Sequence, residues 1–309
     1  MKSGIKRKEM LPDLLRRNTI LNKEAEIEIF FVKIISFIAL LDFTILIADF
    51  KAFWGENSII PFELGLVNSL SFAYLHWISY YFSGNMLTYF FYGVGFIYII
   101  LLFIQIFRTK LLLSFPIICF QLILYRSIVH FNYGYDQFIT ISFFYAFCLG
   151  LCRLFKNDSK PHTSTSITSL ALILRIHLCI VYFFSGIAKA AGVGWWNGNS
   201  LYRALSSFKT ELIFPPSILA IAGIGIIFLE TLYPILIYTK FRKWTVLAII
   251  CMHTLIGIFM KLPFFALIMI TWNVFAHPDL FISYFNKKYF FLLMKDRKKL
   301  SDNTEMVYE

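Results

Sequence analysis

The chain has 309 residues, of which 59% are hydrophobic and 19% aromatic, and its mean hydropathy is +0.70. Only 15% of its residues are charged, compared with roughly 25% in soluble domains, so a single water-soluble core cannot bury its apolar side chains. We therefore predict an all-α polytopic membrane protein. The formal net charge of +11 does not indicate a nucleic-acid partner, because lysines and arginines are scattered between apolar runs, where they set membrane topology.

The first 27 residues are polar and basic. They lack the short apolar region and small-residue cleavage site of a secretory signal peptide, so we expect 1–27 to be a basic cytoplasmic segment. Residues 28–281 form the predicted transmembrane domain. Residues 282–309 form a predicted cytoplasmic tail that is rich in charged residues.

Apolar segments follow one another along the chain, and each is long enough, or nearly so, to cross about 30 Å of hydrocarbon as a helix. They predict a bundle of about eight transmembrane helices. Residues 67–82 are shorter and more polar, and they predict an interfacial or re-entrant helix instead. The predicted spans are 28–50, 86–106, 112–131, 136–154, 168–190, 216–239, 244–260 and 263–281.

Clusters of lysine and arginine orient these segments. If all eight cross the membrane, the basic N-terminus, the charged tail and three basic loops fall on one side, which the positive-inside rule makes cytoplasmic. Both termini are therefore expected in the cytoplasm, in an arrangement that fits a bacterial inner membrane. The helix at 67–82 and the loops at 50–65, 131–136 and 192–216 are expected on the outer face.

Charged residues inside the spans need an explanation, because each costs about 2.5–3.5 kcal/mol at a helix centre on insertion scales. Arg175 and Glu230 lie at similar depths in consecutive predicted spans, which predicts a structural ion pair between them. Arg175, Tyr182 and Lys189 follow one another at intervals of seven residues. This spacing places the three side chains on one face of the helix.

Lys189 ends its apolar run, and two interpretations of it are open. A lysine near the membrane interface can extend its ammonium to the headgroups, which is a purely structural role. An amine held in an apolar site instead gives up its proton more readily and can act as a base or a nucleophile. Spacing alone does not choose between these two roles.

Three further titratable residues are of interest: His130, Asp136 and His253. His130 and Asp136 flank the loop after the third predicted span, and His253 lies midway along the seventh. A lone histidine in an apolar helix is more often a packed residue than a catalytic one. The sequence has no HxxxH or HExxH pattern and no carboxylate cluster, so we predict no metal site.

The stretch 175–202, RIHLCIVYFFSGIAKAAGVGWWNGNSLY, resembles the horizontally transferred transmembrane (HTTM) domain. This domain is the membrane part shared by vitamin K-dependent gamma-glutamyl carboxylases and by bacterial proteins of the sporulation-delaying protein B type. The resemblance extends over about residues 28–280. The positions that match are Arg175, Tyr182, Phe183, Ser185, Gly186, Lys189, Trp195, Trp196 and Gly198.

The resemblance implies a site and a cofactor. In the carboxylases, a lysine at the place of Lys189 is the base that deprotonates vitamin K hydroquinone, and a histidine comparable to His130 belongs to the same site. The expected cofactor is therefore a reduced, vitamin K-like quinone, with Lys189 and His130 as catalytic residues. The residues expected to line an outward-facing quinone pocket are Tyr182, Trp195, Trp196, His253 and Asp136.

Two departures limit what the resemblance implies. The carboxylases carry a large extra-membrane portion after the HTTM domain, whereas 28 residues follow the last predicted span here, and Ala188 stands where they have a second lysine. Peptide gamma-carboxylation is therefore not expected.

Two functional hypotheses remain. One is a carboxylase-like membrane enzyme that carries out quinol-linked, base-catalysed chemistry, alone or with a partner subunit. The other is a non-enzymatic accessory protein in the bilayer that supports the maturation or export of, or immunity to, a secreted peptide. A simple transporter is disfavoured, because no pair of Gly/Pro-broken helices occurs in corresponding halves of the chain.

Overall fold

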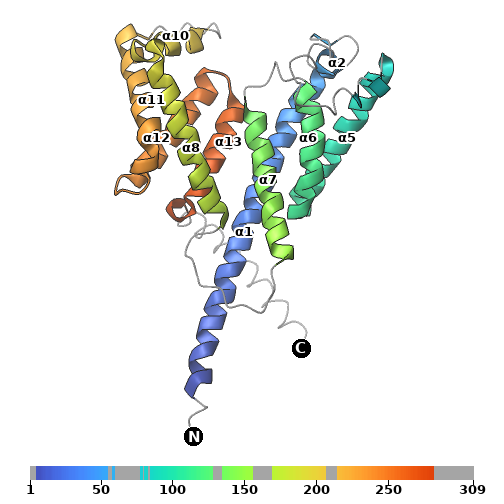
Figure 1. Ribbon diagram of the computed structural model, residues 1–309, viewed down its shortest axis with the longest axis vertical. Helices are drawn as coiled ribbons and strands as arrows, with labels where there is room; N and C mark the ends of the chain where they lie inside the picture. The colour runs from blue at the N-terminus through green and yellow to red at the C-terminus, as the bar shows by residue number, and fades with distance from the viewer. Residues whose placement is uncertain are drawn as a thin grey trace, which may run out of the picture. The chain divides into compact units, whose positions relative to one another are not determined.

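The computed structural model describes residues 5–54, 58–59, 77–78, 80–82, 84–127, 134–155, 169–206 and 214–281. Every regular element in these residues is a helix, which confirms the predicted all-α polytopic bundle (Figure 1). The elements are α1 (Ile5–Ala48), α2 (Phe50–Phe53), α5 (Asn85–Phe107), η1 (Leu111–Leu113), α6 (Ser114–Ser127), α7 (Tyr135–Leu154), α8 (Ser169–Ala191), α9 (Val193–Trp196), α10 (Asn199–Ser206), α11 (Pro216–Leu236), α12 (Arg242–Phe259) and α13 (Pro263–Ala276).

Within the described residues, 6 helices are long and apolar enough to cross a membrane, and they indicate an integral membrane protein. They are α5, α7, α8, α11, α12 and the part of α1 that begins at Glu26. Two shorter apolar helices, Leu111–Ser127 and Pro263–Ala276, coincide with the third and eighth predicted spans. Each predicted span therefore corresponds to one helix, although these two are shorter than predicted.

The first helix is much longer than its apolar part. α1 continues without interruption over 44 residues, through the predicted boundary between residues 27 and 28. At 1.5 Å per residue this is about 66 Å, roughly twice the hydrocarbon thickness of a bilayer. The change in composition near Glu26 is therefore not a break in the backbone.

The chain divides into two compact units. Neither unit is one continuous segment of the chain, and α12 and α13 each contribute residues to both units. The first unit comprises Met1–Leu170, Ala204–Glu211 and Cys251–Thr271, and the second comprises Ala171–Arg203, Leu212–Ile250 and Trp272–Glu309.

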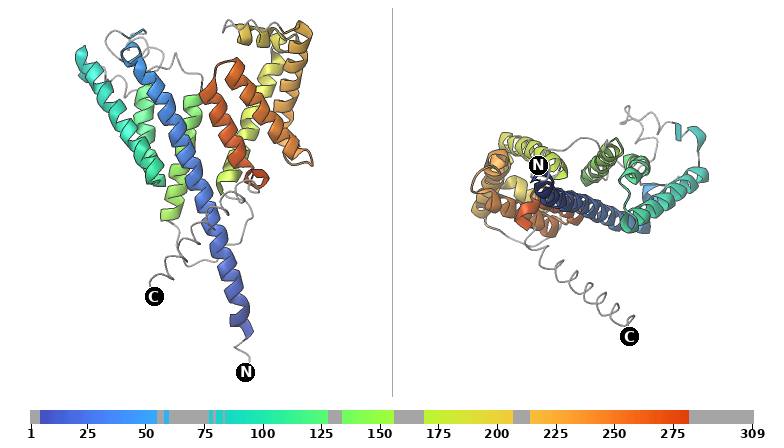
Figure 2. Two further views of the ribbon diagram at one scale, coloured as in Figure 1. Left: turned by 180° about the vertical axis from the view of Figure 1, so that it is seen from behind. Right: turned by 90° about the horizontal axis from the view of Figure 1, so that it is seen from below.

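Four helices of the first unit, α1, α5, α6 and α7, run side by side (Figures 1 and 2). α1 and α5 approach closely at Gly95, where an added Cβ atom would lie 3.0 Å from the Phe43 ring. Phe43 also packs edge-on against Tyr98, with the two ring centroids 5.2 Å apart. In the last turn of α7, Arg153 forms an ion pair with Glu28 of α1. Aromatic packing thus holds α5 against α1, and one ion pair holds α7 against α1.

The chain that follows α1 is anchored to the same bundle through Trp54. This side chain is buried, and its Nε1 donates a hydrogen bond of 2.8 Å to the carbonyl of Leu124 on α6. The Trp54 ring also packs against Phe50, with centroids 4.8 Å apart. A buried indole with its N–H satisfied fixes the position of α2 against α6.

In the second unit, α8 and α11 approach closely at Gly186. At Gly186 of α8, an added Cβ atom would lie 2.6 Å from the backbone nitrogen of Thr231 on α11, a separation that only glycine permits. The short helix α9 then lies against the first half of α11, because the Trp195 carbonyl contacts the position where Gly223 has no side chain. These contacts define the surroundings of Lys189.

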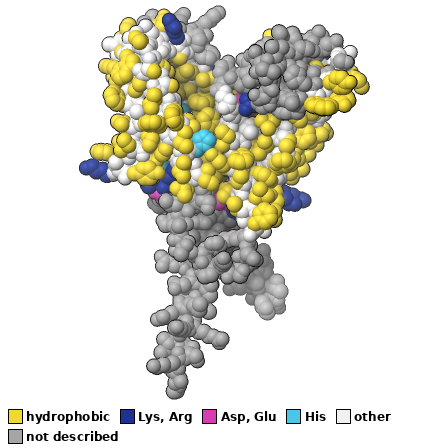
Figure 3. All heavy atoms as spheres, in the orientation of Figure 1, with side chains coloured by type: hydrophobic (Ala, Val, Ile, Leu, Met, Phe, Trp, Pro, Cys, Tyr) yellow, Lys and Arg dark blue, Asp and Glu magenta, His cyan; other side chains and the backbone are white. Residues whose placement is uncertain are grey.

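The exterior of the described helices is strongly apolar. Figure 3 shows hydrophobic side chains over most of the described part of the visible face. Soluble monomers rarely expose apolar patches beyond a few hundred Å², so this surface suits a lipid environment. Exposed examples on four helices are Phe37, Phe96, Ile180 and Ile221.

Several sequence-based predictions lie outside the described residues. They include the proposed catalytic His130, the tail 282–309 and most of the predicted helix 67–82.

Candidate functional site

Helix α8 carries the polar face that the seven-residue spacing predicts. Arg175 and Tyr182 are both buried, at 8% and 2% exposure, and the Lys189 side chain is 19% exposed. An apolar helix with three such residues on one face directs that face into protein rather than lipid. α8 therefore presents its polar residues to α11 and to the chain around Asn273, as their hydrogen bonds show.

The ammonium of Lys189 is held inside the second unit. Its Nζ donates to Oε2 of Glu230 at 2.6 Å and also to Oγ of Ser185, one turn earlier on α8. The side chain therefore points back along α8, whereas a lysine that extends to lipid headgroups would point past the helix end at Ala191. The geometry favours a buried ion pair over the headgroup interpretation.

The local sequence of α11 exposes extra polar atoms beside this pair. Pro234 lies inside the helix and has no backbone N–H, so it cannot donate to the carbonyl of Glu230, four residues earlier. The hydroxyl of Thr231 is buried and has no hydrogen-bond partner among the described residues. Buried polar atoms without partners are uncommon, and each calls for an explanation. Thr231 directly follows Glu230 in the chain.

Helix α9 closes over the end of α8 with two tryptophans. The Trp195 ring centroid lies 5.2 Å from Nζ of Lys189, which is within cation–π range. Trp196 is 43% exposed and donates from Nε1 to the Ala190 carbonyl at 2.7 Å. Trp195 therefore stabilises the charge of Lys189, whereas Trp196 caps the helix end.

Apart from the Lys189–Glu230 ion pair, the second unit contains a chain of hydrogen bonds between buried side chains. Asn273 Nδ2 donates to the Tyr182 hydroxyl at 2.7 Å, and the Tyr233 hydroxyl donates to Asn273 Oδ1 at 3.3 Å. The Tyr233 oxygen also lies 3.2 Å from Nε2 of His277. Since Tyr233 has only one hydrogen, Nε2 of His277 is assigned as the donor in this contact.

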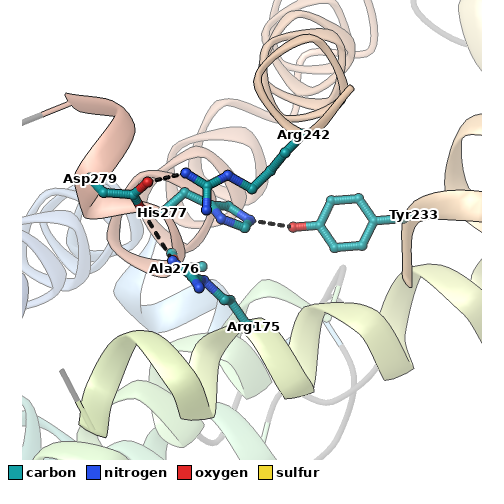
Figure 4. Close-up of polar contacts among 6 residues, drawn as sticks. All are labelled: Arg175, Tyr233, Arg242, Ala276, His277 and Asp279. Carbon is teal, nitrogen blue, oxygen red and sulfur yellow. Dashed lines mark hydrogen bonds and ion pairs between the residues drawn. The ribbon is translucent and has the colours of Figure 1, made fainter. Parts of the chain in front are cut away.

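Arg175 is part of a second charged group, near the end of α13 (Figure 4). Its Nε donates to the carbonyl of Ala276, the last residue of α13, and its Nη2 donates to Asp279 at 3.1 Å. Arg242, the first residue of α12, forms an ion pair with the other oxygen of Asp279. The guanidinium of Arg175 thus caps a helix C-terminus, where a positive charge is favourable.

The predicted ion pair between Arg175 and Glu230 is wrong. Glu230 pairs with Lys189, and Arg175 pairs with Asp279. Similar depths in consecutive spans predict a pair only where the two helices end at matching levels. The contact between Gly186 and Thr231 instead aligns the last turns of α8 with the second half of α11, and this offset brings Lys189 level with Glu230.

Asp136 and His253 lie in the first compact unit, apart in sequence from the residues around Lys189. Asp136 is in the first turn of α7, where it is 2% exposed, and its carbonyl accepts a hydrogen bond from Gln121. The His253 ring is also buried and packs edge-on against Phe265, with centroids 5.6 Å apart. Both are packed residues within their own unit.

The geometry assigns roles to residues that sequence reasoning did not single out as partners. Ser185 and Thr231 border the ion pair, Asn273 and His277 extend the hydrogen-bond chain, and Asp279 joins two arginines. No group of three or more His, Cys, Asp or Glu side chains able to hold a metal occurs among the described residues.

Comparison with known proteins finds no match: no family model, no curated protein and no solved structure is similar to the chain.

Proposed function

We propose that this integral membrane protein is of the HTTM type and removes a proton from a weakly acidic hydroxyl at the Lys189–Glu230 pair. The observation that carries the proposal is the 2.6 Å contact between this ammonium and carboxylate, with side-chain exposures of 19% and 6%. Charged side chains inside membrane helices mark functional sites by default. The resemblance of residues 175–202 to the HTTM motif supplies the substrate class, a reduced quinone.

The protons of such a step balance. Across a short contact, the ammonium–carboxylate form and the amine–carboxylic acid form of the pair differ only in where one proton lies. In the second form, Lys189 is the base: its amine takes the proton of the quinol hydroxyl and becomes the counter-ion of the oxyanion. The total charge of the site is unchanged, which suits an apolar site where an isolated charge is costly.

The remaining candidate residues extend this proposal. Tyr182, Trp195 and Trp196 supply aromatic surface for a quinone ring, and Trp195 is already adjacent to Lys189. The resemblance also proposes His130 as a second acid or base, whereas Asp136 and His253 are packed within the first unit and take no part in the proposed reaction.

The test is quinol oxidation by the purified protein in proteoliposomes, with a reduced naphthoquinone as substrate and molecular oxygen as oxidant. Lys189→Ala should lower the rate by about 10²–10⁴-fold, which is the usual contribution of a general base. Lys51→Ala, which changes an exposed lysine on α2, is the matched control and should retain the wild-type rate. Oxidation that does not depend on Lys189 would rule out the proposal and favour the accessory-protein hypothesis.

We also propose that the protein lies in a bacterial inner membrane with both termini in the cytoplasm. Lys189, Glu230 and Ser185, which we call the Lys189 centre, are then accessible from outside. The support is the one-sided distribution of basic loops, including the turn at Lys240 and Arg242. Thr239 is exposed in this turn. An impermeant thiol reagent should therefore label Thr239→Cys only from the cytoplasmic side, and labelling from the outside would reverse the orientation.

A further inference from the structure

The turn that joins α11 to α12 carries exposed aromatic and basic side chains together (Figure 1). Its sequence from 238 to 244 is YTKFRKW. Three aromatic rings are exposed, Tyr238 by 71%, Phe241 by 52% and Trp244 by 67%. Lys240 and Lys243 are exposed between them. Rings and cations are thus presented side by side in the sequence, at the end of two helices that are able to cross a membrane.

Thr239 holds the backbone of this turn in place. Its hydroxyl donates to the Leu236 carbonyl at 2.8 Å and accepts from the backbone N–H of Phe241 at 3.2 Å. The backbone N–H of Arg242 donates to the Thr239 carbonyl at 3.1 Å. Three hydrogen bonds converge on one residue, so the exposed side chains stand on a defined backbone conformation.

The cations of the turn are not used equally within the protein. Arg242 forms an ion pair with Asp279, which also pairs with Arg175, so two guanidinium groups share one carboxylate (Figure 4). Lys240 and Lys243 form no ion pair with any described residue. Four cations against one carboxylate leave this group with a net charge of +3. The turn therefore offers uncompensated positive charge to an anionic ligand.

The aromatic rings indicate the medium in which that ligand lies. Trp and Tyr concentrate at the level of lipid headgroups, where an apolar ring and a polar tip are both accommodated. The exposed side chains before and after the turn, Ile235 and Leu247, are purely aliphatic and suit hydrocarbon. The Lys240 ammonium lies 5.5 Å from the centroid of the Phe241 ring, so a cation and a ring are already adjacent at this level.

We propose that residues 238–244, which we call the headgroup turn, bind the phosphate group of an anionic phospholipid. Lys240 and Lys243 supply the positive charge, and the three exposed rings pack against the glycerol and the first carbons of the acyl chains. A soluble acidic partner would match the lysines but would leave the rings without an apolar environment. A zwitterionic lipid would cover the rings but would leave the positive charge uncompensated. The headgroup turn shares no residue with the Lys189 centre, so the two proposals can fail separately.

Fluorescence of Trp244 in liposomes tests the proposal, because bromine atoms quench a nearby tryptophan. The protein is reconstituted in phosphatidylcholine that contains a small fraction of either brominated phosphatidylglycerol or brominated phosphatidylcholine. Subtracting the signal of Trp244→Phe isolates this ring from the other tryptophans. At equal fraction, brominated phosphatidylglycerol should quench Trp244 more strongly, and the ratio gives the preference of the turn for the anionic lipid.

The double variant Lys240→Gln/Lys243→Gln should lose this preference. Each lysine near an anionic surface strengthens binding about fivefold, so the two together account for a preference of about 25-fold at low salt. Arg108→Gln/Lys110→Gln is the matched control, because it removes the same charge from exposed residues between α5 and η1. The control should keep the preference. Both variants change only exposed side chains, so both should fold.

An equal preference in the two double variants would overturn the proposal, because net charge alone would then be responsible. A wild-type protein without a preference would overturn it as well. Inorganic phosphate, exchanged for chloride at constant ionic strength, should not change the quenching, since it lacks the acyl chains that the rings require. Relief of the quenching by phosphate would show that the turn takes a soluble anion, which also contradicts a lipid site.

Discussion

Lys189 illustrates how a single side chain changes meaning with its surroundings. Its ammonium is held by Glu230, Ser185 and the Trp195 ring, so three kinds of interaction converge on one charge. A charge with this many partners is fixed in position, which a reacting group requires. The same arrangement also makes the pair sensitive to loss of either member, because the remaining charge would be buried alone.

Removing Glu230 should therefore destabilise the protein more than removing both charges. We expect Glu230→Ala to cost about 2–3 kcal/mol, somewhat below the 3–5 kcal/mol of fully buried pairs, because the Lys189 side chain keeps 19% exposure. The double variant Lys189→Met/Glu230→Leu should recover most of the loss, since no charge remains. Thermal unfolding in detergent measures both.

The control for this comparison is Glu26→Ala, which changes an exposed glutamate on α1 and should leave the melting temperature unchanged. If the single and double variants lost the same stability, the pair would not be the source of the effect.

At this scale the sequence predicts which residues are buried better than it predicts their partners. The seven-residue spacing places Arg175 and Tyr182 on a face that the structure buries. The partner of Arg175 is Asp279, which lies inside the eighth predicted span but beyond the end of α13. Pairing depends on how far one helix slides along another, and a single sequence does not contain that offset.

Among the elements, the contact between α8 and α11 depends on one glycine. Gly186→Ala would place a methyl group 2.6 Å from the Thr231 nitrogen, and because backbone cannot move as a side chain can, the helices must separate. We expect a loss of about 1–3 kcal/mol, typical of overpacking. Separation of the helices should also weaken the Lys189–Glu230 contact, so quinol oxidation should fall with stability.

Gly225→Ala on α11 is the matched control, because nothing lies within 4 Å of the added Cβ atom. Alanine is favoured over glycine inside a helix by about 0.5–1 kcal/mol, so this variant should be neutral or slightly more stable. A Gly186→Ala protein as stable as Gly225→Ala would show that the two helices are not in close contact.

Hydropathy predicts the elements well in number and position, but it misplaces several ends. The last predicted span runs unbroken to residue 281, whereas α13 ends at Ala276 and the backbone is helical again from residue 278 to residue 281. Pro278 explains the difference, since the residue before a proline avoids helical conformation. Hydropathy also could not show that α1 continues as a helix back to Ile5, because polar residues can extend a helix without being in the membrane.

For the whole molecule, the apolar exterior predicts where water can reach. Cys119 and Cys251 are free and exposed on α6 and α12. If these surfaces face lipid, an impermeant maleimide should not label either thiol in intact membranes, whereas a membrane-soluble maleimide should label both. Thr239→Cys, in the exposed turn before α12, should react with the impermeant reagent in inside-out vesicles. Labelling of Cys119 and Cys251 by the impermeant reagent would contradict lipid burial.

The pairing of Lys189 with Glu230 has a consequence for how the chain enters the membrane. The two residues are 41 positions apart, on apolar helices that follow one another during synthesis. A charge without a partner is costly inside the hydrocarbon, by up to about 2.5–3.5 kcal/mol at its centre, so α8 and α11 gain by leaving the translocon together as one hairpin. Glu28, by contrast, has its partner Arg153 125 positions later in the chain, so this pair forms only after that much more of the protein has been synthesised. The Lys189 centre can therefore be complete before α12 and α13 have been made.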